Sequence, residues 1–160
     1  MKDVTIDACF VVMLLEGAQQ QGLACDPILL RNGISRLALA KSGTRVPLKS
    51  FAAFAIEIMK TLDDECLGLT QRKQRLGSFN MMCRSCISAR NIRRSLKRAA
   101  KFWNLFQNGY QHDVVISDEQ VSYTLSPIDG QRPLNNYLPE AILSSIHRFH
   151  CWLDRKSVVR

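Results

Sequence analysis

The stretch Gly77–Phe106, GSFNMMCRSCISARNIRRSLKRAAKFWNLF, decides the fold of this 160-residue chain. It contains no proline and is rich in residues that favour helices. Its second half has apolar residues at helical spacing, which are Ile92, Leu96, Ala99, Trp103 and Phe106. Because Asn91 is a good N-cap residue, the pattern predicts two consecutive helices, over residues 78–88 and 92–107, with a break at 88–91.

The length and composition predict one globular domain over residues 1–160. Hydrophobic residues make up 46% and charged residues 22% of the chain, which is ordinary for a folded protein. No apolar run approaches the roughly 18 residues that a membrane span needs. The first apolar run is short and follows Asp3 and Asp7, so we expect neither a signal peptide nor a membrane partner.

Towards the N-terminus, apolar periodicity predicts a helix over residues 6–20 and a longer one from Pro47 to about Thr61. Between them, Asp26-Pro27 starts a short helix that ends before Gly33, and residues 34–45 are expected to be a loop. A further short helix, capped by Asp63 or Asp64, is expected to run through Leu69.

After Phe106 the pattern changes from helical to alternating. Residues 110–116 and 120–126 predict a β-hairpin, and Pro139 opens a last helix. A new strand is expected to begin at Val158. The whole order, a helical N-terminal part followed by a hairpin and a C-terminal helix, predicts an α+β fold.

The six cysteines lie mostly within apolar helical patterns, which indicates reduced, structural thiols. Cys83-x-x-Cys86 has two alternatives, a redox pair or half of a zinc site. A zinc site needs four ligands, and the nearest other candidates are His147, His150 and Cys151. We expect ordinary packing, no metal and no cofactor.

No catalytic residues are predicted. The three histidines have no nucleophile or carboxylate in a recognisable arrangement beside them, and no phosphate loop or dinucleotide motif is present. The chain is therefore not expected to be an enzyme.

The formal net charge of +8 is concentrated between residues 72 and 101, which hold ten basic and no acidic residues. Three arginines crowd the start of the second helix, where acidic residues are normally placed. This arrangement predicts an anion site formed by Arg90, Arg93, Arg94 and Lys97. The alternative is a solvated face, or charges paired with the acidic run 63–65.

Residues 77–88, then Asn91-Ile92, Leu96 and Phe102-Trp103, resemble a mostly hydrophobic signature of AraC/XylS-type bacterial transcription regulators. The resemblance is to their N-terminal effector-sensing domain, which is of the arabinose-binding type, and it extends over about residues 8–155. It implies a cytoplasmic regulatory domain that binds a small-molecule effector and forms a homodimer. It also implies that the domain's last strands lie beyond Arg160, and that DNA is contacted only through a helix-turn-helix domain absent from this sequence.

Two functional interpretations follow. In the first, an effector pocket is lined by aromatic and sulfur-bearing residues, which otherwise form plain core; these are Phe79, Met82, Cys83, Trp103, Phe106 and Tyr110. In the second, the chain is a nucleotide- or nucleic-acid-binding module that acts through the basic helix face 90–101.

Overall fold

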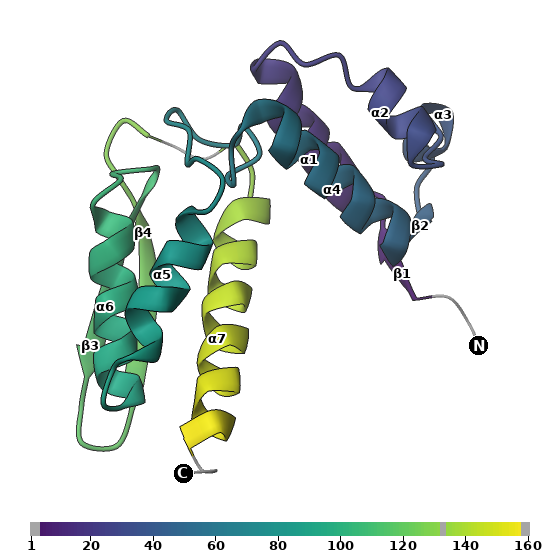
Figure 1. Cartoon of the computed structure of the whole chain (residues 1–160). Helices are drawn as coiled ribbons and strands as arrows, with labels where there is room; N and C mark the ends of the chain where they lie inside the picture. The colour runs from purple at the N-terminus through teal and green to yellow at the C-terminus, as the bar shows by residue number, and fades with distance from the viewer. Residues whose placement is uncertain (1–3, 132–133, 158–160) are drawn as a thin grey trace. The chain divides into compact units, whose positions relative to one another are not determined.

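The computed structural model describes residues 4–131 and 134–157, with side chains through Arg155. The chain forms two compact units (Figure 1), which meet in sequence between Leu76 and Gly77. Helices and short antiparallel strands occur in both units, so the predicted α+β class is confirmed. The expected strand at Val158 lies outside the described residues.

The first unit is mostly helical. Its elements are β1 (Thr5–Asp7), α1 (Cys9–Gln20), α2 (Asp26–Arg31), α3 (Arg36–Leu39), β2 (Arg45–Pro47) and α4 (Leu48–Leu62). The strands β1 and β2 pair antiparallel, with Ile6 opposite Val46. The apolar faces of α1 and α4 form the core of this unit, in which Leu14, Phe54 and Ile58 are fully buried.

Two predictions for this unit are wrong at its N-terminal side. Residues 5–7 form a strand and not the start of a helix, because the Asp7 carboxylate accepts a hydrogen bond from the Cys9 amide and α1 begins only there. Residues 34–45 are not all loop, because the Ser35 hydroxyl caps the short helix α3 and Arg45 begins β2.

The short helix expected after residue 63 is also absent from the described residues. Instead, the buried carboxylate of Asp64 accepts hydrogen bonds from the amides of Cys66, Gly68 and Gln74, at 3.0, 2.9 and 2.8 Å. These contacts hold a compact loop against α1. A Cβ atom on Gly68 would lie 2.6 Å from the carbonyl oxygen of Gly17, so only glycine allows this close approach.

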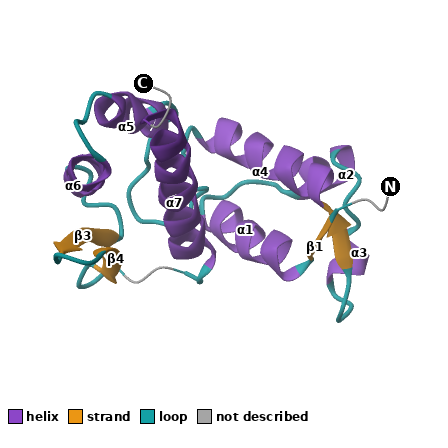
Figure 2. Ribbon diagram, turned by 90° about the horizontal axis from the view of Figure 1, so that it is seen from below, coloured by secondary structure: helices purple, strands orange, loops and turns teal. Residues whose placement is uncertain are grey.

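The second unit is built around one helix. Its elements are α5 (Ser78–Ile87), α6 (Ile92–Asn104), β3 (Tyr110–Ile116), β4 (Val121–Pro127) and α7 (Tyr137–Ser157). Helix α6 contacts α5, α7 and β3, and Figure 2 shows it end-on, with the hairpin on one side and α5 on the other. The two predicted helices and the hairpin are therefore confirmed, with small differences at their ends.

Helix α6 has the two faces that its sequence predicts. Ala99 and Trp103 are buried, whereas Arg94, Lys97 and Lys101 are exposed. The helix ends at Asn104, three residues earlier than expected, because the chain turns towards β3 through the positive φ angles of Gln107 and Gly109.

The hairpin lays one side of β3 on the core. Tyr110 and His112 are buried, while the intervening Gln111 and the following Asp113 are exposed, as the two-residue period of a strand requires. His112 stands opposite Leu125 of β4.

Among the described helices, none is both long and apolar enough to cross a bilayer.

Candidate functional site

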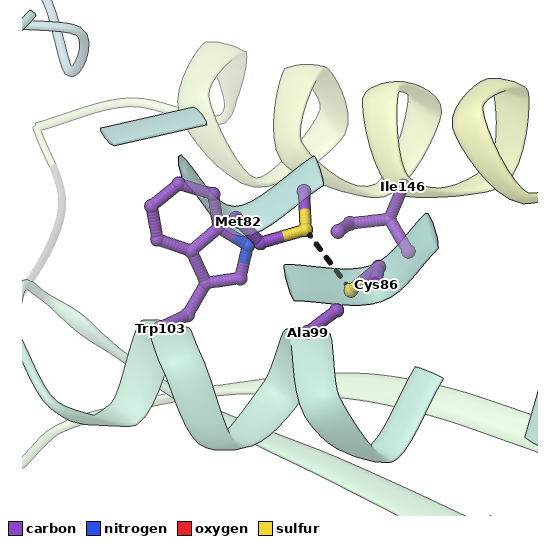
Figure 3. Packing of buried hydrophobic residues seen from close by; sticks show 5 residues of the cluster. All are labelled: Met82, Cys86, Ala99, Trp103 and Ile146. Atoms are coloured by element: carbon purple, nitrogen blue, oxygen red, sulfur yellow. Dashed lines mark hydrogen bonds between the residues drawn. The ribbon is translucent and has the colours of Figure 1, made fainter. Parts of the chain in front are cut away.

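The core face of α6 organises a hydrophobic cluster in the second unit. Figure 3 shows how Trp103 and Ala99 of α6 meet Met82 and Cys86 of α5 and Ile146 of α7. The Cys86 thiol donates to the Met82 sulfur at 3.6 Å and lies 3.4 Å from the Ser95 carbonyl oxygen. Three helices therefore meet in this hydrophobic cluster.

Aromatic rings surround that indole on several sides. Phe79 stacks near it with ring centroids 6.5 Å apart, Phe102 meets it edge-on at 5.1 Å, and Phe106 lies at 6.0 Å. The ring of His112, from β3, is centred 6.3 Å away. We call this set, Trp103 with Phe79, Phe102, Phe106 and His112, the aromatic cluster.

The indole nitrogen of Trp103 is the chemically unusual atom of the aromatic cluster. Trp103 is 7% exposed, and its Nε1 has no hydrogen-bond partner among the described residues. A buried N–H group without a partner costs about 1–3 kcal/mol relative to one that is bonded. A hydrogen-bond acceptor brought to this atom would remove that cost.

His112 supplies a second polar group to the aromatic cluster. It is 6% exposed, and its Nδ1 lies 2.8 Å from the hydroxyl of Tyr123. The Asn104 side chain donates to the His112 carbonyl oxygen and accepts from its amide, both at 2.8 Å, which fixes β3 to the end of α6. Burial lowers the pKa of His112 from its ordinary value of 6.5 to about 4, although Asp113 opposes the shift, so the ring is neutral at pH 7.

His150 is buried on α7 and serves the fold. Its Nε2 lies 3.0 Å from the hydroxyl of the buried Ser95, and its Nδ1 lies 2.8 Å from the Ile146 carbonyl oxygen. Burial lowers the pKa of His150 as well. The ring thus ties α7 to α6 with both nitrogens occupied.

Five of the six expected pocket residues contact one hydrophobic cluster, and the sixth is Tyr110. Met82 and Trp103 belong to the buried cluster, Cys83 and Phe106 pack against it, and Phe79 stacks on Trp103 while remaining 37% exposed. Tyr110 is buried on β3. Met82, Cys83, Trp103 and Phe106 therefore pack as core, and a pocket lined by the six residues stays a prediction.

Sequence reasoning missed His112 as a member of this group. The alternation of Tyr110 and His112 on one side of the predicted strand is the signal in the sequence that indicates it. Its burial depends on how the hairpin docks on α6, which the strand pattern does not contain.

The cysteines and remaining histidines do not assemble a metal site among the described residues, where no group of three or more potential ligands occurs. Cys86 is buried, and burial raises the pKa of its thiol. Cys151 and His147 face each other at 3.5 Å on the exposed side of α7, but His150 points into the core. Both ring nitrogens of His150 are already engaged, by the Ser95 hydroxyl and the Ile146 carbonyl oxygen.

The four residues of the expected anion site are all exposed, but one of them, Arg93, already has a hydrogen-bond partner. Asn91 caps α6 by accepting from the Arg94 amide at 2.9 Å. Arg93 donates to the Asp118 carbonyl oxygen at 3.1 Å, whereas Arg94 and Lys97 point from the exposed face. Within the first unit, Asp63 forms an ion pair with Arg75 at 2.7 Å, and the Asp64 carboxylate accepts hydrogen bonds from backbone amides.

The first unit has an open hollow of about 530 Å³ beside α2 and α3. Its rim carries two of the most exposed apolar side chains, Leu30 and Leu37, at 80% and 83% exposure. The ion pair between Arg36 and Asp26 closes one side. None of the described residues that line this hollow has a buried side-chain polar atom without a hydrogen-bond partner.

The described residues form an α+β fold in two compact units, and no recognisable catalytic arrangement occurs among them. The family model described as the N-terminal arabinose-binding domain of the AraC transcription regulator matches residues 22–159. The chain therefore belongs to this family, which is a regulatory, ligand-binding domain. No curated protein and no solved structure matches the chain.

Proposed function

We propose that this chain binds a small-molecule effector at the aromatic cluster. It would transmit the binding signal to the rest of a cytoplasmic AraC/XylS-type transcription regulator. The observation that carries the proposal is the buried Trp103 nitrogen without a partner. It lies in a domain whose family is named for ligand binding. An effector that accepts a hydrogen bond from Trp103 Nε1 would satisfy this group.

The cluster favours an uncharged effector with a flat or apolar face. Its only titratable member, His112, is neutral at pH 7, and an isolated charge buried among apolar rings is strongly disfavoured. Aromatic rings offer broad apolar surface to such a ligand. Arabinose, which the family description names, meets both requirements and is the first probe to test.

Phe79 is the group through which binding would reach the rest of the chain. It is the most exposed ring of the cluster among those that contact Trp103. It stands in the first turn of α5, two residues after Gly77, where the two units join. An effector that stacks on Trp103 must displace Phe79, so it would shift the population of conformations at this junction.

Replacing Trp103 by Phe tests the donor directly. The ring and its packing are kept, but the N–H group is lost, so effector affinity should fall by about 1 kcal/mol, or roughly five-fold. Isothermal titration calorimetry with arabinose, and then with other uncharged small molecules, gives the affinity for both proteins. Trp152→Phe, on α7 and 48% exposed, is the matched control and should leave affinity unchanged.

Equal affinity of the Trp103→Phe variant and the parent chain for a ligand that binds the parent would contradict the proposed role of the indole. If Trp103→Phe and Trp152→Phe lost affinity for the ligand to the same extent, the effector site would lie elsewhere in the chain.

We also propose that the chain forms a two-fold dimer, and that a following helix-turn-helix domain reads the DNA sequence. The β3–β4 sheet has two strands within the described residues, so each strand presents an unpaired edge. Val115 on β3 is 63% exposed. Closed two-fold dimers are the commonest arrangement of soluble oligomers.

Sedimentation velocity at about 50 μM protein, a range suited to a weak interface, should show a dimer. Val115→Lys should shift the population towards monomer, because lysine on an edge strand disfavours edge pairing. Ile56→Lys, at a similarly exposed apolar position on α4, should not. A parent chain that sediments only as monomer would refute the dimer.

A further inference from the structure

The exposed face of α6 carries four cations, most of which make no polar contact that stabilises the fold among the described residues. They are spaced as i, i+3, i+4 and i+7, which places them on one side of a helix; they are Arg94, Lys97, Arg98 and Lys101. Arg90 and Arg93 continue the positive charge at the start of the helix. We call the four residues on α6 the basic face.

Most of the basic face has no partner. Arg94, Lys97 and Lys101 form no side-chain hydrogen bond or ion pair within the part of the chain that the structure describes. Arg98 is the exception, because its Nη1 donates to the Ser85 carbonyl oxygen at 3.0 Å and to the Ser88 hydroxyl at 2.9 Å. Neighbouring like charges on a helix repel each other. A polyanion that neutralises these charges would remove the repulsion.

We propose that the basic face binds the phosphate backbone of duplex DNA without reading its sequence. At a rise of 1.5 Å per residue, Arg94 and Lys101 are about 10 Å apart along α6. Cations spread over this length suit a polyanion and not one phosphate group. Duplex DNA presents a negative charge about every 1.7 Å of its axis, so several phosphates lie within reach.

Two observations favour duplex DNA over other polyanions. Single strands are normally held by bases stacked on exposed aromatic rings, whereas Trp103 of α6 is buried and Phe102 packs against the hydrophobic cluster. The chain belongs to a family of domains found in transcription regulators. DNA is the polyanion on which such regulators act. This proposal departs from the expectation that only a separate domain contacts DNA, and it does not depend on the effector site.

Fluorescence anisotropy with labelled short duplexes of two unrelated sequences tests the proposal on the whole 160-residue chain. Both duplexes should bind equally. The logarithm of the affinity should fall with the logarithm of salt concentration, with a slope of about −4 between about 50 and 200 mM KCl, as four neutralised phosphates require. The variant Arg94→Gln with Lys97→Gln should reduce that slope by about 2.

The matched control is Lys41→Gln with Lys49→Gln, two exposed lysines of the first unit. It changes the net charge by the same amount and should leave the slope unaltered. Circular dichroism checks the fold of each variant, and Lys101→Gln, which should reduce the slope by about 1, serves if the double variant fails to fold.

Three results would overturn the proposal. The first is a chain that does not bind duplex DNA at about 50 mM salt. The second is a slope that the basic-face variants leave unchanged. The third is tighter binding of a single strand or of a polyglutamate peptide, lost in the same variants, which would assign the face to a different partner.

Discussion

Trp103→Ala is expected to lower the free energy of unfolding by roughly 3–5 kcal/mol, the usual effect of removing a large buried aromatic side chain. Trp103 is only 7% exposed, and its indole packs in the cluster that α5, α6 and α7 form. Its loss would leave a cavity beside Met82 and withdraw support from Phe79. Urea unfolding followed by circular dichroism measures the change.

The control for this substitution is Trp152→Ala. Trp152 is 48% exposed on α7, so its removal should cost less than about 1 kcal/mol. If Trp103→Ala also cost less than about 1 kcal/mol, the indole would be lining open space and the packing described here would be wrong.

Acidification from pH 7 to pH 4 is expected to lower the stability of the second unit by up to about 3 kcal/mol through His112. Its pKa is 6.5 in an ordinary environment and about 4 in the fold. Below pH 6.5 the unfolded chain takes up a proton that the folded chain does not, so stability is complete above this pH. It is lost progressively until the pH reaches the folded value. His150, whose pKa is also lowered, acts in the same direction.

Unfolding free energies measured at intervals between pH 7 and pH 4 test this expectation. His112→Gln removes one titrating ring, so the dependence of stability on pH should become clearly shallower. His147→Gln, on the exposed side of α7, should keep the parent's dependence. An unchanged slope in His112→Gln would mean that the fold does not lower the pKa of His112.

The elements that depend on local pattern were predictable from the sequence. The apolar period of α6 is complete within thirteen residues, and its cap at Asn91 is adjacent, so the helix and its buried face follow from neighbouring residues alone. The hairpin strands were also predicted, because their turn and alternation are local.

The elements that depend on distant partners were not predictable in the same way. The strand β1 exists because Ile6 pairs with Val46, forty residues away. Asp64 reads as a helix cap, yet it gathers amides from as far as Gln74 and organises a loop instead. In both places a tertiary contact overrides the local preference.

The candidate site shows the same division. The α6 pattern identified Trp103 as a core residue, and the resemblance suggested that the neighbouring rings line a pocket. The position of the His112 ring, centred 6.3 Å from the Trp103 ring, depends on how β3 docks on α6 through Asn104. Neither this contact nor the missing partner of Trp103 Nε1 can be read from local sequence pattern.

The most direct test of the proposed effector site is the NMR spectrum of the indole N–H groups in the ¹⁵N-labelled chain. The chain has two tryptophans, so two indole signals are expected, which Trp152→Phe assigns. Titration with arabinose, or with another uncharged ligand shown to bind, should move the Trp103 signal in proportion to saturation and leave the Trp152 signal in place. A ligand that saturates the chain while the Trp103 signal stays unmoved would contradict the account.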